Sequence, residues 1–399
     1  MKVIQINCVY KQGSTGKIVY DIHNTLLKNG IASIVLYGRE KKPAEPNVYK
    51  ISTEIEAKIH AVFSKLFGVE FGFSPIATLR AEHIILKEKP DVVHLHCLNG
   101  HFINVYRLIR FLKKHQIDTV LSLHAEIMHT AGCDHAMDCE KWKTECCDCP
   151  RIQGLVSHFF RDDAKHCYHL MQNACAGFTN LTVVGVSQWI TDRARQSPIF
   201  QDANFATVPN GIDTQVFCRR DGTALRQKLR IPQEKKIILH VTPNFLSPIK
   251  GANYLLELAT RMPEYQFIVV GFNGDKSALP SNVFPIAHTE NQQELAEYYS
   301  MADCFVSTSI RETYPTVCIE AAACGCNVVG FRVGGVPETI PDGMGEAVAP
   351  FDIDALEIAV RKWANCKASN DLIAETNIRF GKTYMTERYM ELYPSVENS

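Results

Sequence analysis

Short runs of β-branched and aliphatic residues alternate with stretches of helical periodicity along most of this sequence. In the stretch 16–30, for example, Ile18, Ile22 and Leu26 recur at helical spacing, and Gly30 follows as a stop signal. Strands that alternate with helices predict parallel, doubly wound sheets of the α/β class. The predicted strands are 3–9, 33–38, 91–97, 118–125 and 181–187 in the front half, and 235–242, 266–271, 303–309 and 327–331 in the back half.

The two sets of strands predict two Rossmann-like domains, which also suits a chain of 399 residues. We place the N-terminal domain at 1–205 and the C-terminal domain at 206–375, with VPNGIDTQVF at 208–217 as the start of the linker. Ligands of such sheets bind at the carboxyl ends of the strands. Two domains that face each other therefore predict a central cleft.

The charge and hydropathy of the chain exclude several kinds of partner and location. With 42 Lys+Arg against 43 Asp+Glu, the net charge of −1 gives no reason to expect a nucleic-acid partner. The N-terminus enters an apolar strand at once, without the regions of a signal peptide. No window approaches the 18 consecutive apolar residues of a transmembrane helix. We therefore expect a cytoplasmic protein whose 15 cysteines stay reduced.

The segment RETYPTVCIEAAACG at 311–325 carries two glutamates on either side of a predicted helix start. Pro315 suits the first turn of a helix, so the amides of Thr316 and Val317 would form an anion site that suits a diphosphate. Glu312 and Glu320 would then hold hydroxyls beyond the two ends of the anion, which is the pattern of a nucleotide sugar. The spacing alone leaves open two glutamates that share no ligand.

The segment GSTGK at 13–17 matches neither common nucleotide-binding fingerprint. A P-loop would need a glycine at position 11 and Ser or Thr after Lys17, but the sequence has Lys11 and Ile18. A dinucleotide fingerprint would need a third glycine at the right spacing from Gly13 and Gly16. The segment therefore gives no support for a P-loop enzyme or a dehydrogenase.

Taken together, the motifs resemble those of retaining GT-B glycosyltransferases of family four, over most of the chain. E-x7-E stands after a strand and before A-A-x-G, as it does in that family. Further pieces follow in matching order: GSTGK at 13–17, VSQWI at 186–190, VPNGID at 208–213, IKG at 249–251 and GFRVGGVPETI at 330–340. The resemblance implies the GT-B fold, with a final helix at about 376–399 that packs back on the first domain. Its aromatic residues would serve packing: Phe380, Tyr384, Tyr389 and Tyr393.

The resemblance also implies roles for individual residues. Glu312 would contact the donor sugar and Glu320 the ribose, while Lys250 would pair with the diphosphate, whose charge grows in the transition state. The arginine that often precedes this lysine in the family is absent from VTPNFLSPIKG. His124 would lie beside the donor sugar, so His124, Glu312 and Lys250 are the predicted catalytic set. The other predicted contacts are Gly13, Gly16, Thr316 and Val317 for the donor, and His96, Asn99, His101 and Asn104 for the acceptor.

The activity that the resemblance implies is retaining transfer of a sugar from a UDP- or GDP-sugar. The acceptor would be a lipid-linked oligosaccharide in bacterial O-antigen, capsule or exopolysaccharide synthesis, and no catalytic metal is expected. A nucleotide-sugar epimerase of the same architecture is one alternative, although it would want acid/base side chains around the sugar. A non-catalytic sugar-nucleotide binding protein is another, and the intact Glu312, Glu320, Lys250 and His124 argue against it.

Two further segments carry predictions. Cys133, Cys139, Cys146 and Cys149 form a C-x5-C-x6-C-x2-C pattern that could close a structural zinc site, the alternatives being free thiols or a disulfide formed after purification. A subgroup of the family in exopolysaccharide and O-antigen synthesis shares this spacing. The segment KIHAVFSKLFGVEFGFS at 58–74 mixes lysines with large apolar residues. We expect those residues to be core, with peripheral contact to the inner membrane surface as the alternative.

Overall fold

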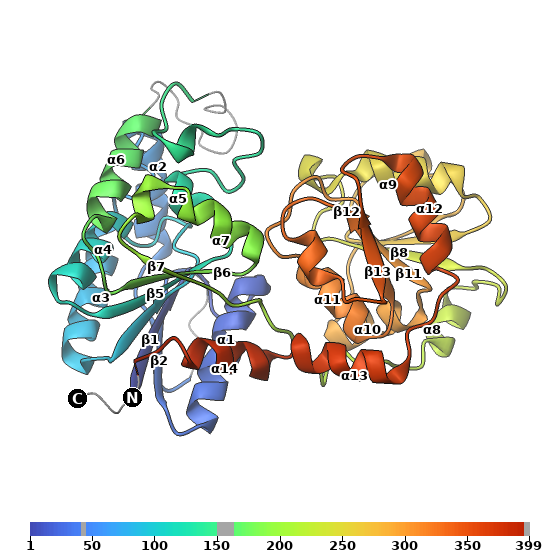
Figure 1. Cartoon of the computed structure of the whole chain (residues 1–399), viewed down its shortest axis with the longest axis horizontal. Coiled ribbons are helices and arrows are strands. Elements are labelled where there is room, and N and C mark those ends of the chain that lie inside the picture. Colours follow the sequence, from blue (N-terminus) through green and yellow to red (C-terminus); the bar gives the residue numbers. More distant parts are fainter. Residues whose placement is uncertain (41–44, 150–162, 395–399) are drawn as a thin grey trace. The chain divides into compact units, whose positions relative to one another are not determined.

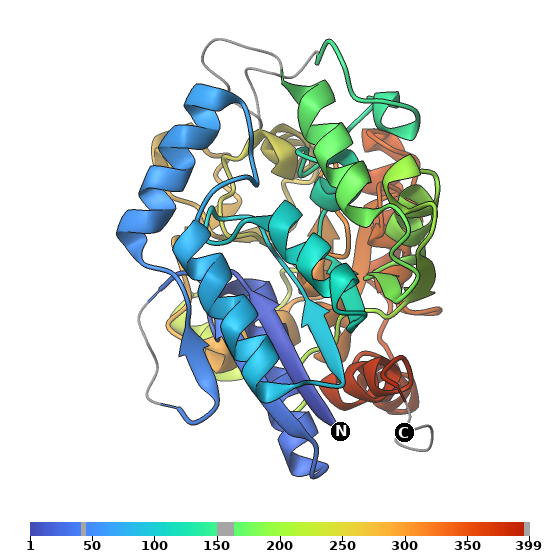
Figure 2. The same ribbon diagram turned by 90° about the vertical axis from the view of Figure 1, so that its left-hand side faces the viewer.

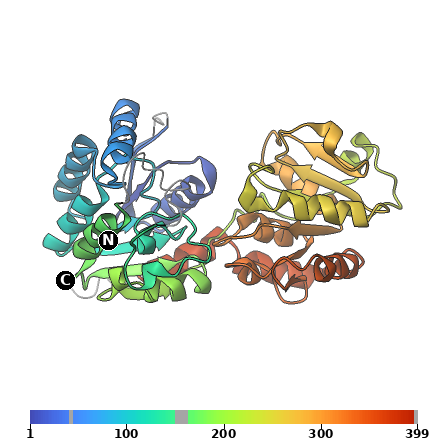
Figure 3. The ribbon, with the colours of Figure 1, turned by 90° about the horizontal axis from the view of Figure 1, so that it is seen from above.

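The computed structural model describes residues 1–40, 45–149 and 163–394, and the chain forms two compact units (Figure 1). Unit 1 comprises Met1–Pro209 together with the chain from Met385 onward, and unit 2 comprises Asn210–Tyr384. The sequence placed the boundary at 205/206 and the start of the returning segment at about 376. Figure 3 shows the red helix α14 (Lys382–Met390) beside the elements of unit 1, although it comes from the other end of the sequence.

Unit 1 is built on a seven-stranded, wholly parallel sheet in the order β3-β2-β1-β4-β5-β6-β7. The five strands predicted from the sequence form its centre. The two edge strands, β3 and β7, were not predicted. The bounds are β1 Lys2–Asn7, β2 Ala32–Tyr37, β3 Val48–Lys50, β4 Val92–Leu95, β5 Asp118–Leu123, β6 Leu181–Gly185 and β7 Asn204–Thr207.

Helices cover both faces of this sheet. Figure 2 shows α3, α4 and α6 in front of the strands, and Ile18, Ile22 and Leu26 of α1 pack against the sheet together with Tyr389 and Tyr393. The predicted helical spacing of these three aliphatic residues is confirmed. The helices are α1 Gly13–Lys28, α2 Glu54–Phe67, α3 Pro75–Glu88, α4 Val105–Lys114, α5 Ile127–Thr130, α6 Ala164–Cys175 and α7 Gln188–Arg195, with 3-10 turns at Lys141–Lys143 and Pro198–Phe200.

Unit 2 repeats the plan with a six-stranded parallel sheet in the order β10-β9-β8-β11-β12-β13. Leucines of α9 and α12 pack with Phe267 and Phe331 into one core on the sheet, and α10 packs against α11 (Figure 1). The strands are β8 Ile237–Val241, β9 Gln266–Val270, β10 Val283–Ile286, β11 Cys304–Ser307, β12 Asn327–Phe331 and β13 Gly345–Val348. The helices are α8 Thr223–Lys228, α9 Ala252–Arg261, α10 Gln292–Met301, α11 Thr316–Ala323, α12 Ile353–Trp363 and α13 Asn370–Arg379, with 3-10 turns at Pro248–Lys250, Lys276–Ala278 and Val336–Thr339.

The aromatic residues near the C-terminus are buried as predicted, with one exception. Phe380, Tyr389 and Tyr393 are buried, whereas 41% of Tyr384 is exposed, so the packing role predicted for Tyr384 is wrong. The Tyr393 hydroxyl lies 2.8 Å from His94 Nδ1, and the Tyr389 hydroxyl lies 2.8 Å from Ser122 Oγ. These two tyrosines therefore attach α14 and the residues after it to β4 and β5 by polar contacts as well as by packing.

The expectation that the apolar residues of 58–74 form core is wrong for most of helix α2. Phe71 is buried, but a stripe along α2 faces solvent, with exposed fractions from 40% to 73%. Ala57, His60 and Ser64 take the buried side of the helix instead, because they are small or find polar partners within the unit. The stripe consists of Ile55, Ile59, Val62, Phe63, Leu66 and Phe67. In the described part of the chain, no helix is both long enough and apolar enough to cross a membrane.

Candidate functional site

The predicted lysine and the first glutamate of the E-x7-E pattern meet in unit 2. Lys250 ends the 3-10 turn Pro248–Lys250 after β8, and Glu312 lies in the loop between β11 and α11. The Lys250 Nζ donates to Glu312 Oε1 over 2.5 Å, with 24% and 16% of the two side chains exposed. Each group is thus held by the other at the carboxyl-end side of the sheet, where α/β folds bind ligands.

Two glycines explain why the backbone can bring these residues together. Gly251 follows Lys250 with φ of +63°, and a Cβ there would lie 2.0 Å from Thr308 O. Gly334 has φ of +55°, and a Cβ there would lie 1.7 Å from Glu312 O. Both positions need the left-handed region and a close backbone approach, which only glycine combines without strain. The G-G of GFRVGGVPETI therefore supports the loop that carries Glu312.

Helix α11 begins at Thr316, as the sequence predicts. Pro315 precedes it and offers no side-chain cap, while Cys318 N donates to Pro315 O over 3.1 Å. The first-turn amides of Thr316 and Val317 have no intrahelical acceptor by the geometry of an α-helix. They give this end of the helix the positive potential that anions favour.

The second glutamate, Glu320, lies in the second turn of α11, where it is half-buried. The Tyr299 hydroxyl of α10 donates to Glu320 Oε2 over 3.0 Å. Tyr299 is fully buried, and burial followed by the Glu320 carboxylate raises the pKa of its phenol well above the usual range. The phenol therefore remains a donor, and it orients the carboxylate. This partner was not predictable from the sequence, because a tyrosine on a preceding helix is ordinary core composition.

The glycines of GSTGK lie at the start of α1 in unit 1. Gly13 opens the helix with φ of +62°, and a Cβ there would meet nothing within 4 Å. Gly16 lies inside the first turns, where a Cβ would lie 3.2 Å from Lys11 N and 3.2 Å from Val9 Cγ2. Gly16 thus lets the helix close on the 9–11 loop, whose Lys11 N donates to Gly16 O.

Three histidines at the ends of β4 and β5 form a stack in unit 1. The ring centroids of His94 and His96 are 3.9 Å apart, and those of His96 and His124 are 5.7 Å apart. His96 Nδ1 lies 3.4 Å from His124 Nε2. Burial lowers the pKa of His124 to about 4 and holds the pKa of His96 well below its ordinary value, so both rings are neutral near pH 7. The structure thus brings into contact His124, predicted to lie beside the donor sugar, and His96, predicted to contact the acceptor substrate.

The other predicted acceptor-side residues have different surroundings. Asn99 is half-exposed, and His101 Nε2 lies 3.0 Å from Glu70 Oε1. Asn104 is the N-cap of α4: its Oδ1 accepts from Arg107 N over 2.9 Å and its Nδ2 donates to Gly72 O. Asn104 therefore has a structural role as the N-cap of α4, which its place before a helix could have signalled.

The predicted zinc ligands lie in the segment that follows α5. Burial raises the pKa of the Cys146 thiol to about 12, and the nearby thiols of Cys133, Cys139, Cys149 and Cys147 raise it further. Within 1–40, 45–149 and 163–394, no three His, Cys, Asp or Glu side chains are arranged as a metal site. Zinc binding here stays a prediction.

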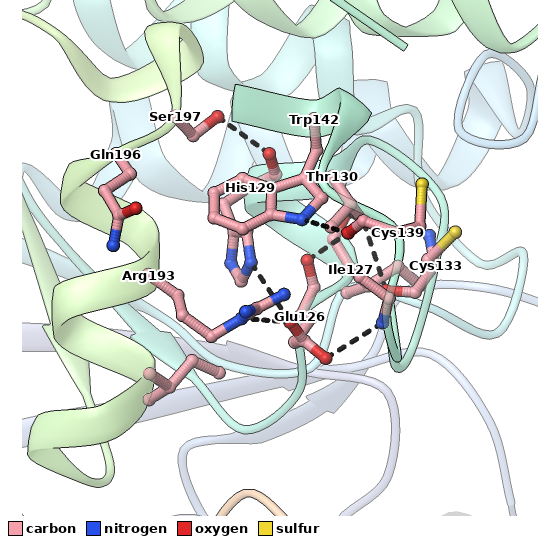
Figure 4. A network of polar contacts seen from close by, with 12 residues as sticks. Glu126, Ile127, His129, Thr130, Cys133, Cys139, Trp142, Arg193, Gln196 and Ser197 are labelled. Atoms are coloured by element: carbon pink, nitrogen blue, oxygen red, sulfur yellow. Dashed lines mark hydrogen bonds and ion pairs between the residues drawn. The ribbon is translucent and has the colours of Figure 1, made fainter. Parts of the chain in front are cut away.

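A buried ion pair that the sequence did not reveal anchors this cysteine segment (Figure 4). Arg193 of α7 donates from Nε to Glu126 Oε1 over 2.6 Å, and Ala136 N donates to Glu126 Oε2 over 2.9 Å. The guanidinium lies 4.6 Å from the centre of the Trp142 ring, and Trp142 Nε1 donates to Cys139 O over 2.8 Å. The Glu126 carboxylate thus joins α7 to the loop 133–142 at Ala136, and the Arg193 guanidinium contacts the end of that loop at Trp142.

Family profiles match both halves of the chain. The profile described as Glycosyltransferase Family 4 matches residues 15–216, and the profile described as Glycosyl transferases group 1 matches residues 221–380. The putative colanic acid biosynthesis glycosyl transferase WcaC of Escherichia coli K12 is 29% identical over 411 residues, which cover 98% of each chain.

Solved structures agree on the fold. Sucrose-phosphate synthase from Thermosynechococcus elongatus superimposes with a TM-score of 0.65 at 18% identity, over 98% of each chain. Anabaena HepE, solved in complex with UDP-glucose, gives a TM-score of 0.63 at 14% identity, over 98% of this chain and 99% of HepE. Since the first profile spans half of the chain and the second most of the rest, the chain belongs to the family 4 glycosyltransferases and is a glycosyltransferase of the GT-B type.

Proposed function

We propose that this enzyme transfers a sugar, with retention, from a UDP- or GDP-sugar to a lipid-linked oligosaccharide in bacterial surface-polysaccharide synthesis. The observation that carries the proposal is the arrangement in unit 2, where Lys250, the start of α11 and Glu320 surround one end of the sheet. The UDP-glucose in the HepE complex supports the donor class, and the E. coli colanic acid relative supports the pathway class.

The chemistry proposed for these residues follows from their charges. When the bond from the anomeric carbon to the diphosphate breaks, negative charge grows on the leaving oxygen. The Lys250 ammonium and the amides of Thr316 and Val317 would stabilise that charge. The acceptor hydroxyl would attack the same face, and its proton would pass to the departing phosphate. No catalytic metal is needed in this scheme, so we expect turnover to continue in EDTA.

Glu312 is paired with Lys250, the same residue that is proposed to bind the donor diphosphate. Its Oε1 accepts from Lys250 Nζ. We propose that the diphosphate draws Lys250 toward itself and leaves Glu312 to accept from sugar hydroxyls. Glu320, oriented by Tyr299, would accept from the ribose.

The exposed stripe of α2 supports a lipid-linked acceptor. Six large apolar side chains face solvent along four turns, with Lys58 and Lys65 also exposed on the same helix. An amphipathic helix of this kind can lie in the interface of a membrane with anionic lipids. We propose peripheral contact with the inner membrane surface through α2, which would bring unit 1 to an acceptor anchored in the bilayer.

Binding of nucleotides tests the donor site. Thermal unfolding is measured with UDP, GDP and their common sugars on the wild type, Glu320→Ala and Tyr299→Phe, with Glu257→Ala as a surface carboxylate control in the same unit. A nucleotide at a hundredfold excess over its Kd should stabilise the wild type by about 2.7 kcal/mol. We expect Glu320→Ala to lose this stabilisation, Tyr299→Phe to weaken it and Glu257→Ala to keep it. If no nucleotide acts, or Glu320→Ala responds like the wild type, the proposed donor site is wrong. Release of an altered sugar without an acceptor would indicate an epimerase instead.

A further inference from the structure

A third residue, Gln5, determines which ring donates in the hydrogen bond between His96 and His124. Gln5 lies in β1, beside β4, and is fully buried. Its Oε1 lies 3.2 Å from His96 Nε2, and His96 Nδ1 lies 3.4 Å from His124 Nε2. The three side chains therefore form one hydrogen-bonded chain across β1, β4 and the end of β5.

The chemistry of an amide fixes where each proton lies in this chain. An amide oxygen can only accept, so His96 Nε2 must carry the proton. A neutral imidazole has one N–H, so His96 Nδ1 presents a lone pair and must accept from His124 Nε2. His124 then carries its single proton on Nε2, and its Nδ1 is an acceptor. Both rings stay neutral because burial disfavours the charged form.

The series of hydrogen bonds ends at His124 Nδ1. This atom is buried and, among the described residues, accepts no hydrogen bond. Buried polar atoms in folded proteins are almost always paired, with protein, water or ligand. A lone pair at this position suits a hydroxyl group and repels the oxygens of phosphate or carboxylate, which are acceptors themselves.

We propose that Gln5 and His96 are positioning residues that hold His124 in the Nε2–H form, so that its Nδ1 accepts from a hydroxyl of a bound sugar. The inference deepens the proposed function and rests on it for the identity of the ligand. The Nε2–H form also excludes one role for His124, because Nδ1 then has no proton to give to the departing phosphate. A sugar that lacks the hydroxyl facing Nδ1 would leave that nitrogen unpaired.

His94 provides an internal reference for this assignment. It stacks on His96, yet its Nδ1 lies 2.8 Å from the Tyr393 hydroxyl and its Nε2 lies 2.8 Å from Ser122 Oγ. Hydroxyls can donate or accept, so both ring nitrogens of His94 are paired in either neutral form. A change at Gln5 should therefore leave His94 unaltered.

Nitrogen-15 spectra of the full chain, labelled at histidine, test the proton positions directly. His96→Asn and His124→Asn assign the two signals. We expect both rings to show protonated Nε2 and unprotonated Nδ1 from pH 6 to 8. Gln5→Met, which removes the acceptor, should mix the two neutral forms at His124. A proton on His124 Nδ1 in the wild type, or an unchanged His124 in Gln5→Met, overturns the positioning role.

The ligand is tested in the same spectra. UDP-glucose and GDP-mannose are added, with UDP and GDP alone as controls. A sugar nucleotide that stabilises the protein should move the His124 Nδ1 signal, and its nucleotide alone should not. A stabilising sugar nucleotide that leaves this signal in place overturns the assigned hydroxyl contact. If no nucleotide stabilises the protein, the proposed donor site fails, while the free-protein spectra still decide the role of Gln5 and His96.

Discussion

Replacing Arg193 by methionine should cause a large loss of stability in unit 1. Glu126 is fully buried and only 13% of the Arg193 side chain is exposed, so the pair is largely shielded from water. Methionine keeps much of the aliphatic volume that packs under Trp142 and removes the charge. The Glu126 carboxylate would then lose its 2.6 Å contact with the guanidinium, while Ala136 N would remain a donor and His129 Nε2 would remain at 3.6 Å.

The expected size follows from the burial of the pair. Removal of one partner from a buried ion pair costs about 3–5 kcal/mol, because the remaining charge stays out of water. Arg195, two residues along the same helix, pairs with Asp192 at 3.5 Å with 49% and 54% of the side chains exposed. Pairs of that kind contribute about 0–1 kcal/mol. Arg195→Met is therefore the matched control.

Urea unfolding followed by tryptophan fluorescence measures the difference. The chain has three tryptophans, of which Trp363 lies in unit 2, so a Trp363→Phe background leaves Trp142 and Trp189 to report on unit 1. With a slope of about 2 kcal/mol per M, the midpoint should fall by about 1.5–2.5 M in Arg193→Met and by less than about 0.5 M in Arg195→Met. Adding Glu126→Gln to Arg193→Met should restore most of the loss, since no charge is left buried. A loss below about 1 kcal/mol in Arg193→Met would show that the pair does not hold the fold.

Three further results are expected. If the cysteine segment binds zinc as the sequence predicts, the purified enzyme should contain about one zinc per chain. The zinc should be lost in Cys146→Ser and kept in Cys366→Ser, which changes an exposed thiol. Absence of zinc from the wild type would exclude the site. Phe63→Glu with Phe67→Glu should reduce sedimentation with anionic vesicles, and unchanged sedimentation would exclude α2 as the contact. Burial lowers the pKa of His60 from 6.5 to about 4, so the unfolded state alone binds this proton between those values. The free energy of unfolding should thus fall as pH falls from 6.5 to 4, by about 1.4 kcal/mol per pH unit for this group. If His60→Gln shows the same dependence of stability on pH as the wild type, the contribution assigned to His60 is wrong.

The strands that the sequence predicted and the strands that it missed differ in one physical respect. All nine predicted strands lie inside the two sheets or next to their edges, where both faces are covered and both neighbours are strands. Central strands of parallel sheets therefore read as continuous β-branched runs. The four missed strands, β3, β7, β10 and β13, are the outermost strands of the two sheets. An edge strand of three or four residues needs little apolar sequence, so its pattern resembles that of a loop.

The donor-side residues of unit 2 were predictable because local sequence determines their geometry. Pro315 sets the start of α11, and glycines at 251 and 334 permit the close approaches that bring Lys250 to Glu312. Such features show in a stretch of a few residues. The exposure of α2 was not predictable in this way, since its apolar residues follow a helical period whether they face the core or solvent.

Contacts between residues that are distant in the sequence are the hardest to predict from the sequence. Gln5, His96 and His124 meet because β1, β4 and β5 are neighbours in register, with Gln5 opposite His94 and His94 opposite Val120. Once the strand order is known, residues at matching ends of these strands must be close. A predicted topology could therefore have suggested that Gln5, His96 and His124 form a hydrogen-bonded series. Arg193 and Glu126 lie 67 positions apart, on a helix and a loop, and no register relates them. A buried charge pair of that kind can be found only from the packed structure, because its sequence signature is that of any surface arginine and glutamate.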